Sequence, residues 1–142
     1  MTTGRAGSGP GPVRGLVVAH ADLAAALVRT VERISGIEQA LEPISNDGLG
    51  AGSLRERLES EAGADPLIVF VDLATGSCGM AGLGVAKGRE NVAVVTGANV
   101  PMLLDFVFNR DRPLEELVDR LVERARTGIR GHGCAPPVSD GP

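Results

Sequence analysis

The chain has 142 residues, 14 Lys and Arg against 18 Asp and Glu, and a formal net charge of −4. This length corresponds to one domain, and the mildly acidic charge excludes a basic surface for nucleic acid. Three Phe, with no Trp or Tyr, are too few for a base-stacking platform. The two His and two Cys do not show the spacing of a structural zinc site.

The two ends of the chain differ in composition from its middle. Residues 1–13 and 128–142 are rich in glycine and proline, and they offer too little apolar surface to offset the entropy of ordering them. We therefore expect one domain over residues 14–127 between two flexible tails. No apolar run is long enough to span a membrane, and we expect no signal peptide. The two cysteines, Cys78 and Cys134, fit a reducing, cytoplasmic location.

Apolar periodicity predicts strands and helices that alternate through the middle of the chain. Leu23, Leu27, Val31 and Ile34 share one face of a helix that ends at Gly36. The other predicted elements are strands over 15–19, 41–44, 67–71 and 92–95, a helix that begins at the capping box Ser53-Leu54-Arg55-Glu56, and helices over 77–87, 100–108 and from Pro113 to Gly128. This order predicts an α/β fold, with a doubly wound, mainly parallel sheet flanked by helices in a single domain.

Polar residues follow the predicted strands at their carboxyl ends, where parallel sheets bind ligands. His20 follows the first strand, and Asp72 follows the strand over 67–71. If these strands are neighbours, a carboxylate that accepts from Nδ1–H of the imidazole leaves the Nε2 lone pair free to act as a nucleophile or base. Thr75, Gly76 and Ser77 open a helix whose N-terminal N–H groups can bind phosphate. The combination suits a histidine that accepts a phosphoryl group.

Three segments resemble the mannose-type enzyme IIA domains of the bacterial phosphoenolpyruvate-dependent sugar phosphotransferase system. They are residues 15–20, residues 69–77 and residues 94–103. The third is the most specific, because the turn Gly97-Ala98-Asn99-Val100-Pro101-Met102 into a helix is not a general feature of α/β domains. The resemblance covers about residues 14–110.

The resemblance implies a phosphotransferase, a protein-histidine phosphoryl carrier that needs no cofactor or metal and forms a homodimer. It implies that His20 accepts a phosphoryl group from the histidine-containing phosphocarrier protein. The group then passes to a IIB component, which phosphorylates a sugar during uptake through a membrane permease. By the same match Asp72 orients His20, and Thr75, Gly76 and Ser77 bind phosphate. Asn99 is a candidate for a supporting position further from the phosphoryl group.

The sequence departs from the family pattern at two places next to the candidate site. Ala21 stands where the family commonly has Gly, and the loop Thr75–Met80 lacks the Pro and Asn that are common there. The altered loop motivates an alternative, a regulatory interaction module whose phosphorylation state is read by another protein without any transport. A flavin- or nucleotide-binding domain is disfavoured, because no Gly-rich loop follows the first strand.

Simpler structural roles remain open for the same residues. They are a solvated loop position for His20, helix or turn capping for Asp72, Ser77 and Asn99, and a positive φ for Gly76. Cys78 is interpreted as a small apolar side chain, since thiolate chemistry has little support without a nearby base. The glycines at positions 79, 82 and 84 indicate close packing of a helix against the sheet.

Overall fold

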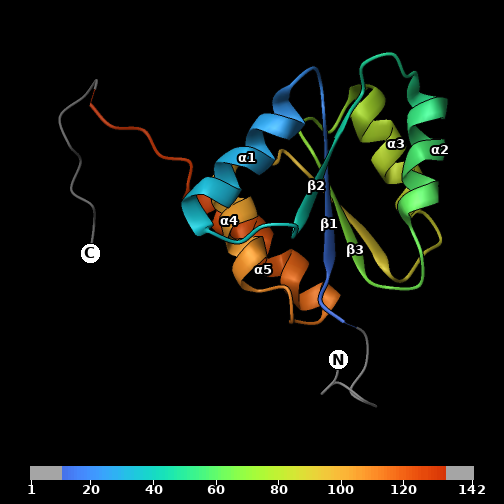
Figure 1. The fold of residues 1–142 in the computed structure, drawn as a ribbon. Helices are drawn as coiled ribbons and strands as arrows, with labels where there is room; N and C mark the ends of the chain where they lie inside the picture. Colours follow the sequence, from blue (N-terminus) through green and yellow to red (C-terminus); the bar gives the residue numbers. More distant parts are fainter. Residues whose placement is uncertain (1–10, 134–142) are drawn as a thin grey trace.

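Four parallel strands form one sheet in the order β2-β1-β3-β4 (Figure 1). They are β1 (Arg14–Ala19), β2 (Leu41–Ser45), β3 (Leu67–Val71) and β4 (Val92–Thr96). The structure is a computed structural model that describes residues 11–133. The expected tails over 1–13 and 128–142 therefore lie mostly outside the described residues. The chain leaves β1 first toward β2 and later toward β3 on its other side, so the sheet is doubly wound as predicted.

Helices cover both faces of the sheet (Figure 1). On one face lie α1 (Leu23–Ser35), α4 (Val100–Phe108) and α5 (Leu114–Thr127), and on the other lie α2 (Ala51–Glu61) and α3 (Gly76–Ala86). Because successive side chains of a strand point to opposite faces, each strand contributes to two separate cores. None of the described helices is long and apolar enough to cross a membrane.

The core on the α1 side is built around two of the three aromatic rings. Phe70 on β3 and Phe106 on α4 meet edge to face, with centroids 5.1 Å apart and an interplanar angle of 75°. A Cβ on Gly15 would lie 2.8 Å from the Phe106 ring, so this position of β1 has room only for glycine. Val13 is 2% exposed and its N–H donates to the carbonyl of Arg110. The packed region therefore starts one residue before the predicted boundary at residue 14.

The helix boundaries test the capping predictions. Gly36 ends α1 with φ +76°, as expected, and Asn99 caps α4 by accepting from the Met102 N–H. The capping box at Ser53 is wrong, because α2 begins at Ala51 after an extended Gly50. Ser53 is the third helical residue, where its backbone is already helical and its side chain has no cap position to fill.

The turn from β1 into α1 holds Ala21 in a left-handed conformation, with φ +51°. The Ala21 N–H donates to Asn46 Oδ1 over 3.3 Å, and the Ala21 carbonyl accepts from Ser45 Oγ over 2.9 Å. A residue with a Cβ is disfavoured in this region by about 1–2 kcal/mol. The two hydrogen bonds to the end of β2 help to hold the turn that follows His20.

Replacing Ala21 by Gly should relieve this conformation. We expect Ala21→Gly to raise the free energy of unfolding by about 1 kcal/mol, measured by urea denaturation. The matched control, Ala25→Gly on the exposed face of α1, should lower it by about 1 kcal/mol, because Gly is a poor helix former. Equal losses in both variants would contradict the left-handed turn.

Three glycines let α3 approach its neighbours, but only Gly82 packs against the sheet as the sequence predicts. A Cβ on Gly82 would lie 3.0 Å from Val94 on β4. A Cβ on Gly84 would lie 3.0 Å from Arg55 of α2. A Cβ on Gly79 would overlap the carbonyl oxygen of Ala74. Gly79 therefore allows the loop that follows β3 to fold back against the first turns of α3.

The close approach at Gly79 predicts a large effect from a single methyl group. Gly79→Ala should lower the free energy of unfolding by about 1–3 kcal/mol, because the loop backbone must shift to admit the Cβ. Gly52→Ala is the control, since Gly52 is exposed in α2 with open space around its Cβ position. That variant should be more stable by about 0.5–1 kcal/mol. The same change in the free energy of unfolding for both variants, measured by thermal or urea unfolding, would refute the packing argument.

Candidate functional site

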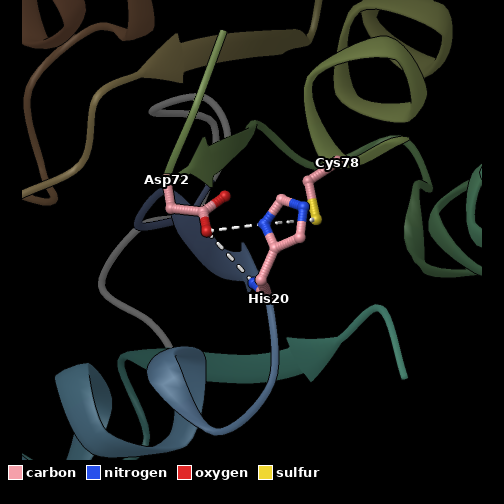
Figure 2. Close-up of side chains that lie close together, drawn as sticks. All are labelled: His20, Asp72 and Cys78. Atoms are coloured by element: carbon pink, nitrogen blue, oxygen red, sulfur yellow. Dashed lines mark hydrogen bonds and ion pairs between the residues drawn. The ribbon is translucent and has the colours of Figure 1, made fainter. Parts of the chain in front are cut away.

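Two neighbouring strands bring His20 and Asp72 together at the carboxyl end of the sheet (Figure 2). Val18 of β1 pairs with Val71 of β3, and the Asp72 N–H continues the ladder by donating to the Val18 carbonyl over 3.3 Å. His20 is the first residue after β1, and Asp72 is the first after β3. β1 and β3 are therefore neighbours, which was the condition for the predicted pairing of His20 with Asp72.

The Asp72 carboxylate is fixed by three hydrogen bonds. Its Oδ2 accepts from His20 Nδ1 over 2.8 Å and from the His20 backbone N–H over 3.1 Å. Its Oδ1 accepts from the Leu73 N–H over 3.0 Å. The Asp72 side chain is 9% exposed, whereas that of His20 is 42% exposed. A nearly buried carboxylate therefore holds an imidazole that solvent and other molecules can reach.

The electrostatics of the pair assign the imidazole hydrogen. Burial raises the pKa of the Asp72 carboxyl, but the hydrogen bonds and charge of His20 outweigh burial, and the pKa lies below its ordinary value of 3.8. At neutral pH the carboxylate is ionised and can only accept hydrogen bonds. The hydrogen of a neutral His20 ring is consequently on Nδ1, and the lone pair is on Nε2.

The first turn of α3 lies beside Nε2. Thr75 precedes the helix with an extended backbone and makes no side-chain capping bond. Gly76 has φ +84°, and a Cβ there would lie 3.9 Å from His20 Nε2. Ser77 lies inside the first turn, so the alternative role left open for it, as the N-cap, is wrong. The uncapped N–H groups of this turn offer an anion site near the imidazole.

Asn99 has a structural role at the end of β4. Its Oδ1 accepts from the Met102 N–H over 3.0 Å, and its Nδ2 donates to the Ala125 carbonyl over 3.3 Å. These bonds cap α4 and connect it to α5. β4 is separated from β1 by β3, so Asn99 lies two strands away from His20. The hydrogen bonds of its side chain do not include His20 or Asp72.

The sequence places Cys78 near the candidate site but does not predict its contact with the imidazole. The buried Cys78 Sγ lies 3.8 Å from His20 Nδ1 (Figure 2). Burial, followed by the negative charge of Asp72, raises the pKa of the thiol, so it is neutral at pH 7. His20 follows β1 and Cys78 lies in the first turn of α3, and no spacing rule connects the two positions. The only signal in the sequence was that Cys78 follows the same strand as Asp72.

Comparisons with known proteins agree with this geometry. The family model described as the phosphotransferase-system fructose IIA component matches residues 15–124. No curated protein matches the chain.

Solved structures of IIA proteins share the fold. A phosphotransferase-system component EIIA from Streptococcus agalactiae has a TM-score of 0.77 and 22% identity, over 84% of this chain and 96% of that one. A mannose/sorbose-specific IIA subunit from Enterococcus faecalis has a TM-score of 0.76 and 18% identity, over 91% of this chain and 100% of that one. The IIA protein associated with the fucose utilization operon of Streptococcus pneumoniae has a TM-score of 0.72 and 22% identity, over 86% of this chain and 94% of that one. From the family match, this chain belongs to the IIA components of the sugar phosphotransferase system.

Proposed function

We propose that the protein is a phosphocarrier whose Nε2 atom of His20 accepts and donates the phosphoryl group. The observation that carries the proposal is the 2.8 Å hydrogen bond from His20 Nδ1 to Asp72, which leaves the Nε2 lone pair free. The exposed ring edge and the adjacent N-terminal turn of α3 support it. Family membership favours this role over a purely regulatory module.

The transfer step can be written with this chain's own atoms. Nε2 attacks the phosphorus of a donor phosphohistidine, and the phosphorus–nitrogen bond of the donor breaks with the electron pair remaining on the donor nitrogen. Positive charge that develops on the His20 ring is stabilised by the ionised Asp72. N–H groups from Gly76 and Ser77, with Thr75 before them, face the passing phosphoryl oxygens. Return of the group to an acceptor reverses these steps.

The surroundings of His20 suit a protein donor and acceptor. Leu23 is 42% exposed and Leu73 is 55% exposed, and each lies within three residues of His20 or Asp72 in the chain. Exposed apolar side chains beside a reactive group fit a protein partner that docks over it. We propose the histidine-containing phosphocarrier protein as donor, a IIB component as acceptor and a membrane permease as the indirect partner. The proposed setting is the cytoplasm, with the protein as a homodimer.

Phosphorylation should depend on His20. We expect incubation with phosphoenolpyruvate and the two general phosphotransferase proteins to add one acid-labile phosphoryl group, detected by intact mass. His20→Ala should remove it completely, because the nucleophile is absent. His132→Ala is the control, since it removes the other histidine of the chain, and it should label as the parent does. Label retained by His20→Ala would overturn the assignment.

Asp72 should control both the rate of labelling and stability in acid. Asp72→Asn removes the charge and favours the wrong tautomer, so labelling should slow by about 10²- to 10⁴-fold. Because folding lowers the pKa of this carboxyl, Asp72 contributes stability above its unfolded pKa that is lost as the pH falls through the folded value. The Asp72→Asn variant should therefore be less stable than the parent protein at neutral pH, and it should lose less stability than the parent on acidification.

Asp65→Asn provides the control for the labelling rate. Asp65 precedes β3 at the opposite end of the strand from Asp72, so its loss should leave the labelling rate unchanged. An Asp72→Asn variant that labels as fast as Asp65→Asn would show that the hydrogen bond to Nδ1 does not prepare Nε2.

A further inference from the structure

We propose that His20, Asp72 and Cys78 form a zinc site that switches the imidazole between metal binding and phosphoryl transfer. One ligand atom from each of these residues lies within 4.8 Å of the others, and this is the one such group among residues 11–133. Phosphoryl transfer makes no use of Cys78. Thiolate, imidazole and carboxylate together are a donor set that favours Zn²⁺ over Mg²⁺ or Ca²⁺.

Two of the three ligand separations are close to those of a tetrahedral centre, and the third is within 4.8 Å. Zn–N and Zn–O bonds of about 2.0–2.2 Å and a Zn–S bond of about 2.3 Å require N···O and N···S separations of about 3.4 and 3.6 Å. Nδ1 of His20 lies 2.8 Å from Asp72 Oδ2 and 3.8 Å from Cys78 Sγ. Opening the first distance by about 0.6 Å and closing the second by about 0.2 Å would meet these values.

The rest of the site also suits a divalent ion. Two charges from Zn²⁺ are balanced by one from the Asp72 carboxylate and one from the Cys78 thiolate, so the bound centre carries no net charge in a partly buried site. Backbone N–H groups of His20 and Leu73 already orient the carboxylate, as outer hydrogen bonds do in metal sites. The His20 side chain is 42% exposed, so an ion can reach the ring from solvent.

Metal binding at Nδ1 changes what Nε2 can do. A neutral imidazole has one hydrogen and one lone pair, so a lone pair used at Nδ1 places the hydrogen on Nε2. The thiol of Cys78 loses its proton to solvent, while the ring keeps its own, and each Zn²⁺ therefore releases one proton. The Nε2 lone pair is then absent. Inhibition of phosphoryl transfer by zinc follows, and this consequence rests on the proposed function of His20.

The metal site is tested first without any phosphoryl chemistry. We expect Co²⁺, used as a spectroscopic probe, to give the full-length protein a thiolate charge-transfer band, and Zn²⁺ to displace it at one equivalent. Cys78→Ala and the size-matched Cys78→Ser should abolish the band and weaken Zn²⁺ binding by at least about 10–100-fold. Cys134→Ala, the control for the other cysteine, should keep both signals. Loss of the band in Cys134→Ala, or its survival in a folded Cys78 variant, would overturn the site.

Zinc and phosphorylation are then measured together. One equivalent of Zn²⁺ should reduce the labelling of the parent protein at least tenfold, and a chelator should restore it. Cys78→Ala should label at the same rate with and without Zn²⁺, which also excludes inhibition of the general proteins. Equal labelling of the parent protein with and without bound Zn²⁺ would overturn the switch. Absence of label without zinc would instead overturn the proposed function, while the cobalt band would still report on the metal site.

Discussion

The hydrogen bond from His20 Nδ1 to Asp72 Oδ2 is the constraint on which the chemistry proposed for this protein depends. It exists because β1 and β3 are adjacent and parallel, so that the first residue after each strand emerges at the same edge. The fold serves this pair by burying the carboxylate and leaving the imidazole exposed. A low pKa at Asp72 then determines which ring nitrogen carries the hydrogen.

Much of this arrangement follows from sequence patterns that reflect physics. The continuous apolar run of β3 predicts a strand buried on both faces, and the polar residue at its end predicts a place in the crevice. Asp72 was found by that rule. Adjacency of β1 and β3 did not follow from the sequence itself, because strand order is set by how helices pack on both faces. The pairing of His20 with Asp72 was therefore conditional until the topology was known.

The predictions that failed concern the starts of two helices, and one contact that was not predicted joins His20 after β1 to Cys78 in α3. Ser53 and Ser77 both have the side chain of a capping residue, yet α2 and α3 start earlier, after an extended Gly50 and an extended Thr75. An extended backbone at a glycine or threonine leaves a weaker mark in a sequence than a serine side chain does. Cys78 was interpreted as a small core residue. Its sulfur does lie in the core on the α3 side, and it also lies 3.8 Å from His20 Nδ1.

The loop after β3 connects the departures of this chain from its family with its chemistry. Cys78 occupies the place where the family loop commonly has Pro, so a residue without reactive atoms is replaced by a metal ligand beside the imidazole. If Zn²⁺ and a phosphoryl group compete for the single lone pair of His20, their effects must be reciprocal. If bound zinc lowers the equilibrium constant for phosphorylation by some factor, phosphorylation lowers the affinity for zinc by the same factor. A phosphoryl group on Nε2 with a hydrogen on Nδ1 leaves no ring lone pair for the metal, so the charged carrier would release zinc and the uncharged carrier would retain it.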